Sequence, residues 1–136
     1  MLLKNKSSTI SGIVKIGNKT KDLIPKLSSN DIAVINHQDI DEIAADSLIK
    51  TGVKAVINMQ NSMTGYYPNR GPEILLEHQV PLFDLVGNKF KNQVVSNQKL
   101  TIVENCIYQN GVFLGEARFF TEEIKKSYQK IANDNL

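Results

Sequence analysis

Two short apolar runs, separated by about the length of one helix, constrain the fold of this chain more than any other feature. Residues 31–35 (DIAVI) and 53–57 (VKAVI) are almost continuously apolar, which is typical of strands buried on both faces. Between them, apolar side chains recur at helical spacing on one face, at Ile40, Ile43, Ala44 and Leu48. A strand–helix–strand unit of this kind predicts parallel pairing with a right-handed crossover.

Capping signals give this helix its expected ends. Asp39 is placed as N-cap with Glu42 three residues later, which approximates a capping box, and Gly52 is placed just after the helix. Upstream, residues 20–27 predict a short amphipathic turn of helix, for which Asp22 is the candidate cap.

The flanking segments extend the same pattern. Residues 9–16 and 80–85 predict further strands, and residues 71–78 predict a short helix with Pro72 in its first turn. Residues 100–117 contain short β-type runs, with Asn110-Gly111 as a hairpin turn. The sequence therefore predicts an α/β domain of parallel strand–helix–strand units over residues 1–118, ending in an antiparallel β meander, followed by a helix over residues 119–136.

Composition excludes several classes of function. The 136 residues suit one domain, and 16 Lys and Arg against 14 Asp and Glu leave a net charge of +2, so nucleic acid is not an expected partner. No run approaches the roughly 18 apolar residues of a membrane span, so this segment is predicted to be cytoplasmic without direct membrane contact. Two His and the single Cys106 make no recognisable metal-ligand set, and no cofactor is expected.

The polar loop after residue 57 is the main candidate site, because ligands of α/β sheets bind at the carboxyl ends of parallel strands. Ser62, Thr64 and Arg70 together with helix-start N–H groups would suit an anion. Sparse glycine and Glu73 near the helix start argue against a phosphate cradle, so a structural or docking loop is the preferred interpretation.

His37 follows the neighbouring strand and would face the same edge of the sheet. A general base is one interpretation of His37, and a loop histidine is the preferred one. No residue is assigned a catalytic role. The candidate ligand- or partner-binding residues are Asn58, Ser62, Thr64, Gly65, Tyr67, Asn69, Arg70, Gly71, His37 and Asp39.

Four stretches resemble a known family: TKDL (20–23), DIAVINHQDID (31–41), GVKAVIN (52–58) and GYYPNRGPEILLEHQVPLFDLVG (65–87). Together they are similar to the N-terminal region of SteA-like proteins, which are bacterial septum-associated proteins related to thiamine pyrophosphokinases. The most specific part is Gly-x-Tyr-Pro-Asn-x-Gly-Pro, from Gly65 to Pro72. Tyr66 stands where the family usually has Arg, which weakens any role that depends on a cation there.

The resemblance implies a larger protein. Family members follow this region with a linking helix, a nucleotide-binding domain and a membrane segment at the septum, so residues 119–136 would begin the linker. The implied partners are that nucleotide-binding domain and a septal protein.

A second similarity, of fold alone, is to the swivelling β/β/α domain of phosphohistidine phosphotransferases. In those enzymes the loop after the second strand carries a reactive His. Here that loop has Ser62, Met63 and Thr64, and no His lies between residues 38 and 77, so this loop has no phosphohistidine mechanism.

Three hypotheses follow for function. The leading one is a non-catalytic regulatory or docking domain of a SteA-like cell-division protein, acting through residues 59–72. The second is a domain that binds a phosphorylated or nucleotide-like small molecule at the same loop. The third is a homo-oligomeric structural module that associates through the terminal helix.

Overall fold

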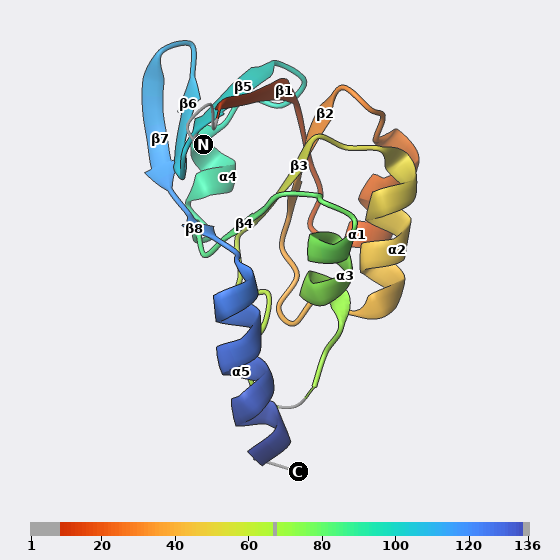
Figure 1. The fold of residues 1–136 in the computed structure, drawn as a ribbon. Helices are drawn as coiled ribbons and strands as arrows, with labels where there is room; N and C mark the ends of the chain where they lie inside the picture. The colour runs from red at the N-terminus through yellow and green to blue at the C-terminus, as the bar shows by residue number, and fades with distance from the viewer. Residues whose placement is uncertain (1–8, 67, 135–136) are drawn as a thin grey trace, which may run out of the picture.

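The computed structural model describes residues 9–66 and 68–134. The elements are β1 (Thr9–Ile16), α1 (Thr20–Leu23), a 3₁₀ turn (Ile24–Lys26), β2 (Asp31–Ile35), α2 (Glu42–Thr51), β3 (Ala55–Asn58), α3 (Gly71–Glu77), β4 (Leu82–Asp84), α4 (Phe90–Gln93), β5 (Lys99–Val103), β6 (Cys106–Gln109), β7 (Val112–Glu116), β8 (Arg118–Phe119) and α5 (Glu122–Asp134) (Figure 1).

The eight strands of the described residues form one mixed sheet in the order β7-β6-β5-β1-β2-β3-β4-β8. Strands β1 to β4 are parallel neighbours, with Ala33 of β2 opposite Val56 of β3. Strands β5, β6 and β7 continue the sheet beside β1 as an antiparallel meander, and β8 pairs antiparallel with β4 at the other edge. The predicted parallel α/β unit and the meander are both confirmed.

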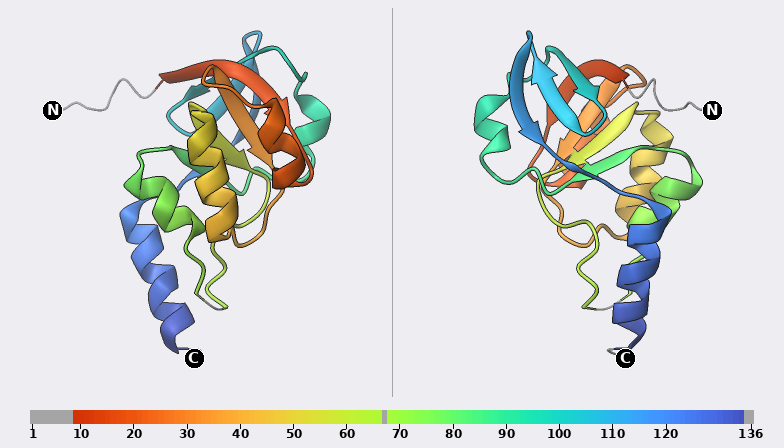
Figure 2. Two further views of the ribbon diagram at one scale, coloured as in Figure 1. Left: turned by 90° about the vertical axis from the view of Figure 1, so that its right-hand side faces the viewer. Right: turned by 60° about the vertical axis from the view of Figure 1, so that its left-hand side comes forward.

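Both faces of the parallel strands are buried, which explains their continuous apolar sequences. Successive side chains of a strand point to opposite faces, so Ala33 and Ile35 join the core beneath helices α1, α2 and α3. Ile32 and Val34 join a second core, which also holds Leu100, Ile102 and Ile107 of the meander and Phe90 of α4. Figure 2 shows the helices on one side of the parallel strands, with the meander and α4 curving round the other.

The start of α2 differs from the prediction. Its N-cap is Asp41, whose carboxylate accepts a hydrogen bond of 2.7 Å from the Ala44 N–H, while Asp39 bonds elsewhere. Gly52 ends the helix in the left-handed conformation, as predicted, with φ of 76°. The predicted apolar face is correct except at Ile43, which is 78% exposed.

Two smaller predictions also need correction. Asp22 lies inside α1, whose N-cap position is Lys19 and has no side-chain hydrogen bond. The terminal helix begins at Glu122 because Arg118 and Phe119 are strand β8, which pairs with β4. Phe120 then enters the helical core with no exposed surface.

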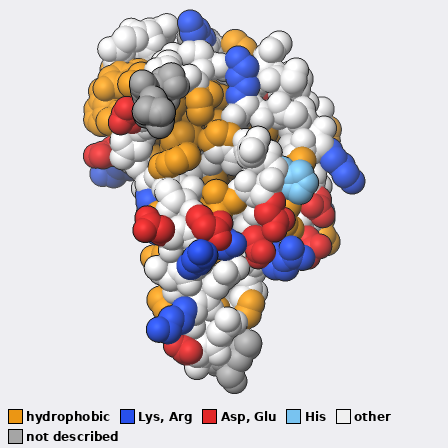
Figure 3. Space-filling view, in the orientation of Figure 1, with side chains coloured by type: hydrophobic (Ala, Val, Ile, Leu, Met, Phe, Trp, Pro, Cys, Tyr) orange, Lys and Arg blue, Asp and Glu red, His pale blue; other side chains and the backbone are white. Residues whose placement is uncertain are grey.

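The hairpin between β6 and β7 turns at Asn110-Gly111, as predicted. Both residues have positive φ, 53° and 77°, which matches the tight turn that this dipeptide favours. Val112 and Phe113 of the edge strand β7 are more than half exposed. Hydrophobic side chains gather over this part of the molecule in Figure 3, whereas acidic and basic side chains are mixed near α3 and α5.

Within residues 9–66 and 68–134, no helix combines the length and the hydropathy that crossing a membrane requires.

Candidate functional site

Asn58, at the end of β3, organises the carboxyl edge of the sheet. Its amide nitrogen donates to the His37 carbonyl oxygen at 2.8 Å and to the Ser62 hydroxyl at 3.0 Å. Its carbonyl oxygen accepts from the N–H groups of His37 and Gln60, at 3.0 and 3.1 Å. Asn58 and Ser62 have no exposed surface. Asn58 therefore holds the backbone of its neighbours, and the Ser62 hydroxyl is bound to Asn58, so neither side chain is presented to a ligand.

Asp39 joins the β2–α2 loop to the β3–α3 loop, which spans residues 59–70. Its two carboxylate oxygens accept from the Thr64 N–H at 2.7 Å and from the Thr64 hydroxyl at 3.0 Å. Asp39 itself has a positive φ of 53°, a conformation that Asp adopts more readily than most residues. The pair explains why neither side chain is available as a helix cap or as an anion-binding group.

The far end of the same loop is fixed to Ile40. The Asn69 amide nitrogen donates to the carbonyl oxygens of Ile40 at 2.9 Å and Ser62 at 3.1 Å. The buried Asn69 Oδ1 has no hydrogen-bond partner among the described residues. The Gly71 N–H also donates to the Ile40 oxygen at 3.0 Å, and a Cβ at Gly71 would overlap that carbonyl. Asn69 and Gly71 are thus required by the close approach of two loops.

Helix α5 covers the middle of the β3–α3 loop, as the paths in Figure 1 and Figure 2 show. Gly65 has a φ of 86°, and a Cβ there would lie 3.2 Å from side-chain atoms of Tyr128 and Ile131. The terminal helix and the family-like segment are therefore in direct contact, which the sequence did not indicate.

An ion pair that the sequence did not predict anchors α5 and the loop together. Arg118 contacts both oxygens of the fully buried Asp84 carboxylate at 2.8 Å. Arg118 also donates to the Asn61 side-chain oxygen at 3.1 Å and lies 5.5 Å from the Tyr128 ring centre. Asp84 also accepts from the Ser62 N–H at 3.0 Å. Asp84 therefore joins β4, β8 and the β3–α3 loop.

The charge state of Arg118 is secured by this arrangement. Partial burial lowers the pKa of the Arg118 guanidinium, but the hydrogen bonds and the negative charge of Asp84 outweigh it, so the pKa is raised overall. The sequence does not suggest Arg118 as a partner of Asp84 because 34 residues separate them, and only the pairing of β8 with β4 brings them together.

Few of the described side chains of the loop are exposed to solvent. Tyr66 is 72% exposed, and Pro68 and Arg70 are also exposed. The Arg70 guanidinium lies 3.8 Å from carboxylate oxygens of Glu42 and Glu73. Tyr67, a predicted contact residue, lies outside the described residues.

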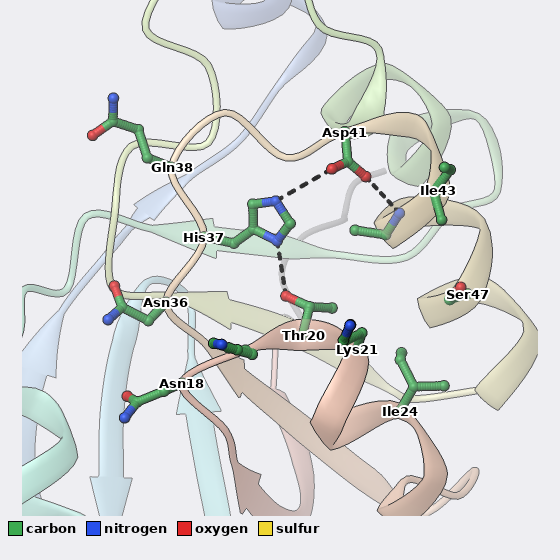
Figure 4. Close-up of a pocket in the computed structure, with 12 residues that line it drawn as sticks. Asn18, Thr20, Lys21, Ile24, Asn36, His37, Gln38, Asp41, Ile43 and Ser47 are labelled. Atoms are coloured by element: carbon green, nitrogen blue, oxygen red, sulfur yellow. Dashed lines mark hydrogen bonds and ion pairs between the residues drawn. The ribbon is translucent and has the colours of Figure 1, made fainter.

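His37 is the one candidate residue whose ring faces a separate cavity. Its Nδ1 shares a hydrogen bond of 2.8 Å with the Thr20 hydroxyl, and its Nε2 lies 3.7 Å from an Asp41 carboxylate oxygen. The cavity, of about 520 Å³, lies at the carboxyl ends of β1 and β2, between α1 and the start of α2. Figure 4 shows His37 between Thr20 and Asp41, with Asn18 and Asn36 on one side and Ile43 on the other.

The structure therefore divides the nine candidates that it describes. Asn58, Ser62 and Asn69 are joined by internal hydrogen bonds, and Asp39 and Thr64 form a second internal pair. Gly65 and Gly71 are close-packing positions, Arg70 is exposed, and His37 faces the cavity. Sequence reasoning missed Thr20, which becomes relevant because α1 begins beside the end of β2.

Groups of three or more His, Cys, Asp or Glu side chains able to hold a metal ion are absent from the described part of the chain.

No family model and no curated protein matches this chain. Among solved structures, it is similar to the crystal structure of an uncharacterized protein from Pseudomonas syringae pv. tomato str. DC3000, with a TM-score of 0.38 and 10% sequence identity. The match covers 95% of this chain and 66% of the other.

Proposed function

We propose that this chain is a non-catalytic docking domain of a SteA-like bacterial cell-division protein, with residues 59–72 as its contact surface. The resemblance of GYYPNRGP to the family segment supplies the cellular context. The observation that carries the docking role is that internal hydrogen bonds already occupy the polar side chains Ser62, Thr64 and Asn69 of this loop. Asp39 holds Thr64, and Asn58 and Asn69 hold Ser62.

A loop fixed in this way suits recognition by a partner. It loses little conformational entropy on association, which is the main benefit of preorganisation. Its exposed side chains, Tyr66 and Arg70, are of the types that most often dominate binding energy at protein interfaces. The side chains beneath them are occupied structurally, so binding rather than chemistry is the function that this surface supports.

The layering of the molecule supports the swivelling β/β/α interpretation of the fold. Helices pack on one face of the parallel strands, and an antiparallel meander packs on the other. In that class the domain acts by moving between partners. Helix α5, which contacts Gly65, would link the loop to the nucleotide-binding domain that family members carry, and the loop would contact a septal protein from the cytoplasmic side.

Two experiments test the proposal in the organism that encodes the chain. A fluorescent fusion of the full-length gene product should concentrate at the division septum, and the double variant Tyr66→Ala plus Arg70→Ala should become diffuse. Val112→Ala is the matched control, because Val112 is 59% exposed on β7, away from the loop. Diffuse fluorescence of the wild-type fusion would refute the septal role.

Photocrosslinking tests the surface separately. A photoreactive phenylalanine analogue in place of Tyr66 should crosslink to a septal protein or to the nucleotide-binding domain, and the same analogue in place of Val112 should not. Equal yields from the two positions would contradict a docking role for residues 59–72.

A further inference from the structure

The cavity beside His37 is lined by no described residue of the docking loop and has the features of a ligand site. Its volume of about 520 Å³ falls within the range of about 300–1,000 Å³ that small-molecule pockets occupy. It opens at the carboxyl ends of the parallel strands β1 and β2, where α/β sheets place their ligands. Most of the side chains that line it are polar.

His37, in the lining of the cavity, is held in place by hydrogen bonds with two buried side chains. The backbone of His37 is bound on both its N–H and its carbonyl oxygen by the buried Asn58 amide. Its ring is oriented by the Thr20 hydroxyl at Nδ1, and Thr20 is only 6% exposed. The imidazole, about a quarter exposed, is therefore fixed with one edge toward the cavity.

The charges around the cavity favour an anion. Lys19 and Lys21 from the start of α1 line it, against the single carboxylate of Asp41. One oxygen of that carboxylate accepts from the N–H of Ala44, and the other faces His37 Nε2 at 3.7 Å. The ammonium groups of the two lysines supply donors that suit a phosphate or carboxylate group.

The opposite wall is apolar and exposed. Ile43 projects beside the cavity and is 78% exposed, the highest value among the large exposed hydrophobic side chains of the described residues. Ile24 lies nearby on the α1 side (Figure 4). Helix α2 has its apolar face turned to the core, so Ile43 is not needed for packing. An apolar group bound in the cavity would cover the Ile43 side chain.

We infer that this cavity binds a small organic anion, with the anionic head at Lys19 and Lys21, close to the His37 ring, and an apolar body against Ile43. Phosphate and carboxylate heads share this chemistry. None of the described residues of the docking loop lines this cavity, so either assignment can fail without the other.

The chain offers a direct spectroscopic readout because it contains only two histidines. In proton NMR at fixed pH, the imidazole Cε1–H signal of His37 should shift saturably on adding phenyl phosphate. The signal of His78, which is exposed at the end of α3, should not. His78→Gln leaves one imidazole signal and assigns it.

Variants separate the two ends of the ligand. Ile43→Ala should weaken phenyl phosphate binding by about tenfold, because the phenyl ring no longer packs against an isoleucine, while binding of inorganic phosphate is unchanged. Lys21→Gln should weaken both. Ile131→Ala, which removes an exposed isoleucine from α5, is the control and should change neither. Comparing the affinities of benzoate and phenyl phosphate shows whether the site prefers a carboxylate or a phosphate group.

The inference is overturned if neither phenyl phosphate nor benzoate shifts the His37 signal at concentrations up to about 10 mM, which corresponds to binding too weak to matter. It is also overturned if the two histidine signals move in parallel, since that indicates general anion effects. Equal affinity of wild type and Ile43→Ala for phenyl phosphate overturns the claim that Ile43 contacts the apolar part of the ligand.

Discussion

Replacing Arg118 with methionine tests the ion pair that joins β8, the loop and α5. The substitution removes two hydrogen bonds of 2.8 Å from the Asp84 carboxylate and one of 3.1 Å from the Asn61 side chain. It keeps a long apolar side chain in place. Asp84 then remains fully buried, with the Ser62 N–H as the donor that the structure still shows on it.

The expected cost follows from leaving a buried charge without its partner. Breaking a buried ion pair from one side costs about 3–5 kcal/mol. The Arg118 side chain is 23% exposed, so water reaches the site and the low end applies, about 3 kcal/mol. A domain of this size has a folding free energy of about 5–15 kcal/mol, so Arg118→Met should remain folded but much less stable than the wild type.

Urea unfolding, extrapolated linearly to water, measures the change in the free energy of unfolding. The double variant Arg118→Met plus Asp84→Leu is the control, because it removes both charges. Its loss of stability should be clearly smaller than the sum of the two single losses. A loss below about 1 kcal/mol for Arg118→Met, or additive losses in the double variant, would refute the claim that the pair acts as a buried unit.

Three further substitutions test other parts of the structure, each by urea unfolding. Gly71→Ala should cost about 3 kcal/mol, because the new Cβ overlaps the carbonyl of Ile40; a cost under about 1 kcal/mol would mean that the two loops do not meet as described. Leu48→Ala should cost about 2–5 kcal/mol from the buried face of α2, while Ile43→Ala on the exposed face should cost about 0.5 kcal/mol or less. Equal costs for these two would contradict the orientation of the helix. Asp41→Ala should cost about 1 kcal/mol through the loss of an N-cap, and an unchanged midpoint would argue that this cap does not contribute.

The parallel strands could be predicted because burial on both faces leaves a plain signature. Residues 31–35 and 55–58 are apolar at nearly every position, and both cores described above require this. The hairpin was predictable for an equally local reason, since Asn110-Gly111 supplies two residues that tolerate positive φ.

Errors arose where a tertiary contact competed with a local rule. Asp39 is a residue type that often caps helices, but its carboxylate is bound by Thr64. Asp41 caps the helix instead. Ile43 fits the helical stripe in sequence, yet the helix is rotated so that Ala44 and Leu48 meet the core.

The candidate site was predicted at one edge of the sheet, and the structure reassigns several of its parts. Polar residue types in a loop do not reveal whether they bind each other or a ligand. Asn58 and Ser62 are internal. Thr20 and Lys19 reach the cavity through a connection between β1 and α1, and no residue pattern indicated that this connection would lie beside His37. The septal role and the linked domain remain predictions.

Helix α5 has a mechanical consequence. Its 13 residues form a rod about 20 Å long, with Arg118 fixed to Asp84 just before its first turn and Tyr128 and Ile131 lying against Gly65 farther along. A rod held near one end acts as a lever. If a partner displaces the segment around Gly65 and tilts the rod by about 10°, the far end of a helix of that length moves by about 3.5 Å. A small adjustment in the loop would thus become a larger displacement at residue 134.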